Sequence, residues 1–228
     1  MASATVPYAR AARAHLVRID PVLARIISQV GPIRLARRSE RFQALARAIV
    51  FQQLAGSAAM AIYNRLVALF PGTSFPSPEQ VLATPDDALR KVGLSAKKVL
   101  YLKDLALHIQ KDSLNFHRFP RMTDEEIIGD LTRVKGIGRW TAEMFLMFTL
   151  ARPDVFPATD LGLQNAVTKA YGMRKRPTPK RMREIGERWQ PYRTAAAWYL
   201  WQSLRITLPD SALAPPTKRP ATRRTRRK

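Results

Sequence analysis

The sequence contains no cysteine and only 3 histidines among its 228 residues. Without thiols the chain can form no disulfide, no cysteine nucleophile and no iron–sulfur cluster, whose ligands are normally thiolates. Three scattered imidazoles also argue against a zinc site. No apolar run reaches the roughly 18–20 residues that span a bilayer. We therefore expect no redox centre and no membrane span, and a location in the cytoplasm, or in the nucleus of a eukaryote.

The N-terminus combines arginine and alanine but lacks the apolar core of a signal peptide. The same composition resembles a transit peptide, although these residues run directly into the first helical pattern. From Pro209 onward, Pro, Ala, Thr, Lys and Arg replace that pattern. A segment of this composition buries too little apolar surface to order itself, so we expect a disordered basic tail at 209–228.

Acidic residues are scarce, with 17 Asp and Glu against 39 Lys and Arg, which gives a formal net charge of +22. The last twelve residues hold seven of the cations and no acid, so most of the excess belongs to the body of the chain. A basic body favours a polyanion as partner. The alternative, a membrane surface, would need a cationic helix with a long apolar face, and the sequence offers none.

Helical periodicity dominates the chain, and the length suits one large domain or two small lobes. Asp20-Pro21 and Ser77-Pro78 are typical pairs of a cap and a first helical residue, while Gly93 is suited to a helix end. No segment alternates with a period of two, so nothing predicts a sheet. We expect an all-α fold of about ten helices.

The most informative stretch is 131–160, where a Gly-x-Gly turn separates two helical patterns. Gly136 and Gly138 allow the backbone to approach a ligand closely, and the amides of the following helix start form an anion site. Lys135 and Arg139 flank the turn. A helix rather than a strand precedes it and a third glycine is missing, so it is not a nucleotide-binding loop. Such turns are also common in proteins that bind no ligand there. The residues near the turn must therefore show whether this one forms a binding site.

Asp160 opens the next apolar pattern, where Pro157-x-x-Asp160 is an ordinary helix cap. Capping alone is the usual role of such a residue. Its placement after the turn, together with Trp140, favours a second role as a lone carboxylate beside a bound ligand. In a chain this basic, the combination predicts an enzyme that grips a nucleic-acid backbone and performs carboxylate chemistry next to it.

Residues 131–160 resemble the helix-hairpin-helix and the following Pro/Asp loop of the DNA glycosylase superfamily that contains endonuclease III. The similarity is greater to its 3-methyladenine DNA glycosylase II (AlkA/Mag) branch, on three further motifs: Ala48-Ile49-Val50-x-Gln52-Gln53-Leu54, Arg188-Trp189-x-Pro191-x-Arg193 and Trp198-x-x-Trp201. The resemblance to the superfamily extends from about Leu16 to Leu204. The resemblance implies a glycosylase domain at 1–208, with the hairpin at 131–150, the catalytic loop at 151–160, and an active-site cleft between two lobes.

The chain departs from relatives within this superfamily at several positions. Lyase members carry a Schiff-base lysine just before the Thr-Ala pair, where this chain has Trp140, so the resemblance implies a monofunctional glycosylase without AP lyase activity. The cluster cysteines of endonuclease III-like members and the N-terminal β-domain of larger alkyl-base enzymes are missing. Phe51 stands where the branch usually has Gly or Gln. Thr159 replaces a frequent acid, which leaves Asp160 as the only catalytic candidate in the loop.

The implied activity belongs to base excision repair. An alkylated purine of the 3-methyladenine or 7-methylguanine type would be flipped out of double-stranded DNA, and its N-glycosidic bond hydrolysed, by a monomeric enzyme. Asp160 would stabilise the oxocarbenium sugar and orient water. Two alternatives remain open: a non-catalytic helix-hairpin-helix protein that binds lesions, and a uracil or mismatch glycosylase of the same fold.

The remaining site residues also follow from the resemblance. The base pocket would be lined by Trp140, Trp201 and Met144, with Trp198 in the core, because an aromatic face suits a cationic purine. The gap in the DNA would be filled by Gln53 or Leu54, unless that helix end is buried. Phosphate contacts are expected from Lys135, Gly136, Gly138, Arg139, Thr141, Lys97 and Lys98. For Lys97 and Lys98 the alternative is that they form a solvent-exposed helix face without a ligand. No cofactor is required, although relatives hold a monovalent cation such as Na⁺ or K⁺ on hairpin carbonyls, here those of Thr132, Val134 and Ile137.

Overall fold

The computed structural model of the protein describes residues 5–35 and 40–206, so the expected basic tail at 209–228 lies outside the described part. Within these ranges the chain forms twelve α-helices and one short 3-10 helix, and no β-strand. The predicted all-α class is confirmed, and the number of helices slightly exceeds the expectation. Among the described residues, no helix has both the length and the apolar character that a membrane span requires.

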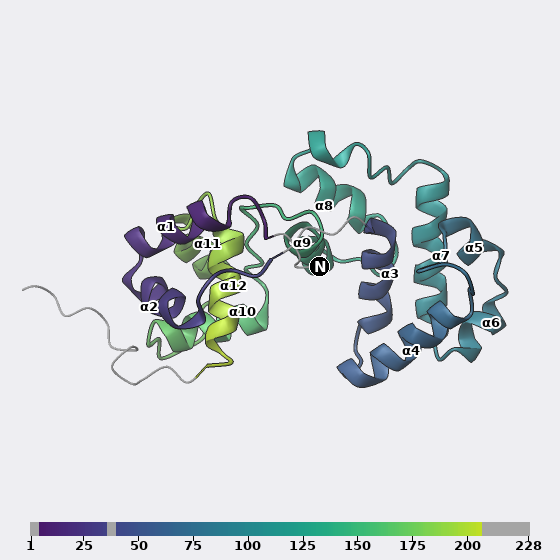
Figure 1. The fold of residues 1–228 in the computed structure, drawn as a ribbon, viewed down its shortest axis with the longest axis horizontal. Coiled ribbons are helices and arrows are strands. Elements are labelled where there is room, and N and C mark those ends of the chain that lie inside the picture. Colours follow the sequence, from purple (N-terminus) through teal and green to yellow (C-terminus); the bar gives the residue numbers. More distant parts are fainter. Residues whose placement is uncertain (1–4, 36–39, 207–228) are drawn as a thin grey trace, which may run out of the picture.

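The helices form two lobes (Figure 1). The first lobe contains α1 (Ala9–Ile19), α2 (Pro21–Val30), α10 (Leu161–Ala170), α11 (Pro179–Glu187) and α12 (Arg193–Ser203). The second contains α3 (Arg41–Phe51), α4 (Gly56–Ala68), α5 (Pro78–Ala83), α6 (Asp86–Lys91) and α7 (Ala96–Gln110). After the 3-10 helix Phe119–Arg121, α8 (Asp124–Thr132) and α9 (Arg139–Phe148) lie between the lobes. The chain therefore leaves the first lobe after α2 and returns to it at α10.

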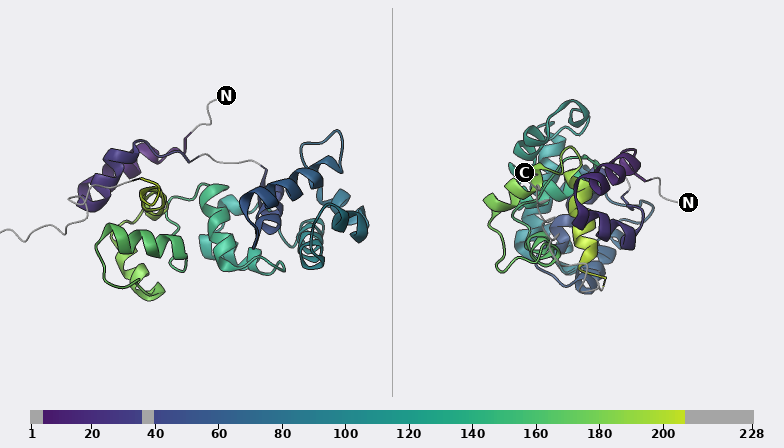
Figure 2. Two further views of the ribbon diagram at one scale, coloured as in Figure 1. Left: turned by 90° about the horizontal axis from the view of Figure 1, so that it is seen from below. Right: turned by 90° about the vertical axis from the view of Figure 1, so that its left-hand side faces the viewer.

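Helix α12 forms the middle of the first lobe, with α1 and α2 on one side and α10 and α11 on the other (Figure 2, left). Ala195, Ala196 and Ala197 are fully buried, and their small side chains let α12 pack closely against α2 and α10. Trp198 is 9% exposed, as expected of a core residue. The close packing of α12 against α10 fixes the position of the loop that leads into α10.

The buried carboxylate of Asp20 joins the early and the late segments of the first lobe. Asp20 caps α2 by accepting hydrogen bonds from the amides of Val22 and Leu23. Its Oδ2 also accepts from the Tyr171 hydroxyl at 2.7 Å and from the Trp189 indole at 2.9 Å. Burial raises the pKa of Tyr171 above its ordinary value, so the hydroxyl stays a donor. This network fixes α2 against the segment that follows Asp160.

Candidate active site

Asp160 begins α10, at the edge of the first lobe. Its backbone N–H closes a turn on the Pro157 carbonyl at 2.9 Å, and its Oδ1 accepts the N–H of Leu163 at 2.6 Å. The residue is therefore a true helix cap, as its sequence context suggests. The side chain is half-buried, which leaves part of the carboxylate within reach of a ligand.

Two indoles hold the same carboxylate from other helices. The Trp140 Nε1–H of α9 donates to Oδ2 at 2.8 Å, and the Trp201 Nε1–H of α12 donates to Oδ1 at 3.0 Å. The Trp201 ring also packs against Phe148, with ring centroids 6.0 Å apart. Each oxygen thus accepts an indole hydrogen bond, whereas capping requires only one oxygen. The arrangement orients a carboxylate in advance, as electrostatic catalysis requires.

Gly162 makes room for this arrangement, and sequence reasoning missed it. A Cβ at this position would lie 3.1 Å from Asp160 Oδ1 and 3.5 Å from Trp201 Nε1. A larger residue would therefore push directly on the hydrogen bond between them. The only local signal was the glycine itself, two residues after Asp160, in a helix where glycine is otherwise unfavourable.

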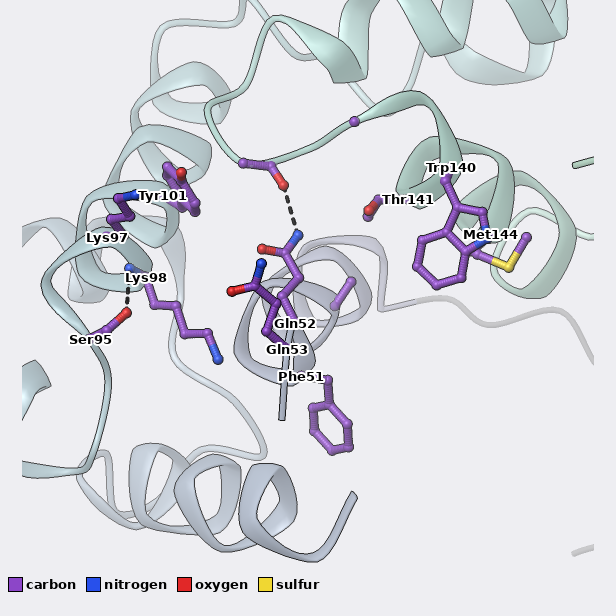
Figure 3. Close-up of a pocket in the computed structure, with 13 residues that line it drawn as sticks. Phe51, Gln52, Gln53, Ser95, Lys97, Lys98, Tyr101, Trp140, Thr141 and Met144 are labelled. Carbon is purple, nitrogen blue, oxygen red and sulfur yellow. Dashed lines mark hydrogen bonds between the residues drawn. The ribbon is translucent and has the colours of Figure 1, made fainter. Parts of the chain in front are cut away.

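A cavity of about 670 Å³ opens between the end of α3, the start of α7 and the hairpin (Figure 3). Lys97 and Lys98 stand on one side of it, and Trp140 and Met144 on the other, with Gln53 between them. Some of the residues predicted to bind phosphate, to fill the DNA gap and to hold the base therefore line one cavity. Such a concave, partly apolar site is the usual form of a binding pocket.

Trp140 connects the cavity to the carboxylate. Its side chain is 48% exposed and lines the cavity, while its Nε1–H points to Asp160. Met144, one helical turn further along α9, lines the same wall. Trp201 is outside the cavity lining and reaches the site only through Asp160. Two of the three predicted pocket residues thus face the cavity, and the third lies behind the carboxylate.

The two hairpin glycines serve different purposes. Gly136 has a φ of +81°, and a Cβ there would lie 2.2 Å from the Tyr101 ring, so the turn sits directly on α7. Gly138 caps α9 with a φ of −90°, and a Cβ there would meet nothing within 4 Å. Thr141, one turn into α9, also lines the cavity. The open side of Gly138 leaves the first amides of α9 accessible to an anion.

Side chains from α3 and α7 fasten the cavity walls. The Gln52 amide donates to the Gly136 carbonyl at 2.7 Å, and the Lys98 ammonium donates to the Val50 carbonyl at 2.8 Å. Burial lowers the pKa of Lys98. Lys97 is exposed, as a phosphate contact must be, whereas Lys98 is half-buried and bonded to the end of α3. Both lysines were predicted to contact phosphate, but in the structure only Lys97 has an exposed side chain without this bond to the protein.

The basic residues flanking the turn are held by carboxylates. The Lys135 amide donates to Asp104 at 2.8 Å, and its ammonium lies 3.6 Å from the same side chain. Arg139 pairs with Glu125, and its Nε lies 3.2 Å from Glu143, in a separate cavity of about 340 Å³. Burial raises the pKa of Glu143. The expected phosphate contact of Arg139 is thus not supported, because its guanidinium is engaged by two acids outside the main cavity.

The predicted gap-filling residues lie in the loop between α3 and α4. Gln53 has a φ of +56°, and Leu54 is 38% exposed. The alternative of a buried helix end is therefore wrong. Gln53 has a strained backbone and lines the cavity, and the exposed apolar Leu54 follows it, as insertion into a DNA stack would require.

Thr132, the first of the predicted cation ligands, ends α8, and Val134 and Ile137 lie in the turn between α8 and α9. The Val134 carbonyl accepts the Ile137 amide at 3.1 Å and keeps a second lone pair for a ligand. Across the described residues, no cluster of three or more His, Cys, Asp or Glu side chains could hold a metal ion. The binding of a monovalent cation by the three carbonyls stays a prediction.

Comparison with known proteins agrees with this geometry. The family model of HhH-GPD superfamily base excision DNA repair proteins matches residues 46–191. DNA-3-methyladenine glycosylase 1 of Schizosaccharomyces pombe is 37% identical over 199 residues, covering 86% of this chain and 87% of that protein. An alkylbase DNA glycosidase-like protein of the same yeast is 33% identical over 204 residues, covering 86% of this chain and 93% of that protein.

Two solved structures share the fold over most of their length. The S. pombe 3-methyladenine DNA glycosylase in complex with abasic DNA gives a TM-score of 0.78 at 37% identity, covering 86% of this chain and 97% of that one. A DNA-3-methyladenine glycosidase from Bacillus halodurans also gives 0.78 at 37% identity, covering 84% of this chain and 88% of that one. Both likenesses extend across the two lobes and the hairpin.

Proposed function

The chain belongs to the HhH-GPD superfamily of base excision DNA repair proteins, and we propose that it removes alkylated purines from double-stranded DNA as a monofunctional glycosylase. The observation that carries the proposal is the carboxylate of Asp160, held by two indoles next to the cavity at the hairpin. Relatives named as 3-methyladenine glycosylases that match most of the chain support the substrate class.

The chemistry follows from the residues around Asp160. The target bond lies inside the duplex, so the nucleotide must be flipped out, and the exposed Trp140 face would stack on a cationic base. An alkylated purine that already carries positive charge leaves well. The barrier then lies in the oxocarbenium sugar, which the fixed negative charge of Asp160 stabilises while it orients the attacking water.

The proposal of a monofunctional enzyme rests on Trp140. Its indole occupies the space beside Asp160 and offers no amine for a Schiff base, so water remains the nucleophile. We propose further that the carbonyls of Thr132, Val134 and Ile137 would hold a monovalent cation, which would stiffen the hairpin without taking part in the reaction.

DNA would be held by backbone and side chains of the second lobe and the hairpin. The accessible amides at the start of α9 suit one phosphate, and the exposed Lys97 suits another. We propose that Gln53 or Leu54, both of which are exposed, fills the gap that an extruded base would leave. We propose further that the protein acts as a monomer, since the proposed reaction calls on no residue from a second copy.

The decisive experiment measures free bases released by the full chain from a methylated duplex, with mass spectrometry of the products. We expect methyladenine and methylguanine, with no release from an undamaged duplex of the same sequence. A uracil-containing duplex is the second control. Release of uracil alone would show that the protein is a uracil glycosylase and not an alkylpurine glycosylase. Tight binding of abasic DNA without release of any base would indicate a non-catalytic lesion-binding protein.

A further inference from the structure

The segment that follows Asp160 is strongly basic. Between Asp160 and Glu184 the sequence has no acid and seven cations, namely Lys169, Arg174, Lys175, Arg176, Lys180, Arg181 and Arg183. They lie at the end of α10, in the loop after it and at the start of α11. The chain as a whole has a net charge of +22, and this stretch contributes seven of its cations without a single compensating carboxylate.

All seven of these side chains are exposed. Arg181 lies 2.9 Å from Glu184, and Arg183 lines the smaller cavity near Glu143. Within the described ranges, no ion pair joins Arg174, Lys175 or Arg176 to a carboxylate, although ion pairs hold Arg139 in place at the hairpin. The loop therefore presents positive charge that the fold itself does not use.

The loop is also firmly seated, unlike an ordinary solvated tail. The Met173 amide bonds to the Thr168 carbonyl at 2.9 Å, and Pro177 is buried. Thr178 caps α11 by accepting the Arg181 amide, and Met182 is fully buried. A frame anchored on both sides holds the cations at a fixed distance from the catalytic carboxylate.

We propose that residues 169–183 form a flank-binding surface, which contacts phosphates of the damaged duplex outside the part held by the hairpin. This inference rests on the proposed function. Asp160 caps α10, whose 10 residues span about 15 Å, which equals the rise of about four base pairs. The loop after α10 is therefore separated from Asp160 by about the length of one short DNA segment.

The chemistry of the surface favours a duplex backbone over other polyanions. No large hydrophobic residue of 169–183 is exposed, so the surface lacks the apolar anchors that a membrane-bound helix inserts. It also lacks exposed aromatic rings on which single-stranded bases would stack. Closely spaced cations without either feature match the regular phosphate charge of double-stranded DNA, which is bound by counterion release.

The test removes three cations from the loop and compares DNA lengths. The triple variant Arg174→Gln, Lys175→Gln and Arg176→Gln is matched by Arg10→Gln, Arg13→Gln and Arg18→Gln on α1, which lies on the opposite side of the lobe (Figure 2, left). Both variants lower the net charge by the same amount. Each is titrated at several salt concentrations with abasic duplexes that extend about three or about twelve base pairs on either side of the lesion.

On the long duplex, we expect the loop variant to lose about tenfold in affinity, and its slope of log affinity against log salt to become shallower by about 1 to 3. The α1 variant should keep the wild-type slope, and the two variants and the wild type should bind the short duplex alike. Base release from a short methylated duplex should also be unchanged. That measurement shows at once that the loop variant is folded.

Several results would overturn the inference. They are equal losses on both duplex lengths, equal behaviour of the two triple variants, and a loss seen only under conditions where one protein bridges two duplexes. Reduced base release from the short duplex would do the same, because the loop would then belong to the active site. If the wild type releases no base from any methylated duplex, the proposed function fails, while the length-dependent binding still decides whether the surface exists.

Discussion

The Asp160 region and the hairpin turn both adjoin the start of α9, yet they are built in opposite ways. Asp160 is positioned by side chains, since the indoles of Trp140 and Trp201 reach it from two other helices. The turn is positioned through its backbone, with Gly136 seated on the Tyr101 ring. The proposed catalytic site therefore depends on particular side-chain groups, whereas the proposed phosphate-binding turn depends on the shape of its backbone.

The largest expected effect comes from removing the charge. Asp160→Asn keeps the size of the side chain but places an amide opposite two indole N–H donors. We expect base release to fall by about 10² to 10³ or more, with abasic-DNA binding within a few-fold of wild type. Single-turnover release from methylated DNA measures the first quantity, and a titration the second. A variant that retains more than a tenth of the wild-type rate would reduce Asp160 to a helix cap.

The hairpin predicts a contrast between two identical substitutions. Gly136→Ala should destabilise the fold by about 2–4 kcal/mol, because it combines a positive φ with a collision on Tyr101. Gly138→Ala should cost less than about 1 kcal/mol, since its Cβ meets open space. Urea unfolding of both variants measures the difference. Similar losses at the two positions would show that Gly138 is also required by the fold, and not by a ligand.

A smaller effect should follow from removing one hydrogen bond to the carboxylate. Trp201→Phe keeps an aromatic ring next to Phe148 and deletes the N–H donated to Asp160. Because hydrogen bonds to charged groups contribute about 1.5 kcal/mol or more, base release should fall about tenfold. Trp201 is outside the cavity lining, so binding of abasic DNA serves as the internal control. An unchanged rate would mean that Trp140 and the helix cap are sufficient.

The smallest expected signal is an absence of covalent chemistry. With Trp140 beside Asp160, borohydride should trap no adduct with a damaged duplex, and abasic sites should stay uncut. A bifunctional glycosylase treated in parallel provides the positive control. A trapped complex would show that a lysine elsewhere supplies the amine. The monofunctional assignment, in which Asp160 directs water and no lysine reacts, would then be wrong.

Local features of the sequence predicted much of the fold. Helix periodicity, the Asp20-Pro21 start of α2 and the glycines of the hairpin are short-range signals, and the structure contains each of them. The same reasoning placed Asp160 at a helix start, which the structure confirms, and its catalytic role stays a prediction. Such signals arise within a few residues, where backbone preferences and capping act.

Contacts between distant residues could not be found in this way. Gln52 bonds to Gly136 across 84 positions, and Trp201 to Asp160 across 41, so no local pattern indicates either pair. The phosphate contact expected of Arg139 was not supported for the same reason, because Glu125 lies on the preceding helix. Charge and spacing indicate which residues can bind a ligand, whereas tertiary packing decides which of them the fold has already used.

The return of the chain to its first lobe has a consequence for biosynthesis. Helices α1 and α2 leave the ribosome first, but the partners that bury Asp20 are Tyr171 and Trp189. The second lobe, made of contiguous helices, can fold while the N-terminal pair still waits for its partners. The lobe that carries Asp160 is thus the last to be completed, and a chain cut short before Trp189 leaves a half-built first lobe exposing the apolar faces of α1 and α2.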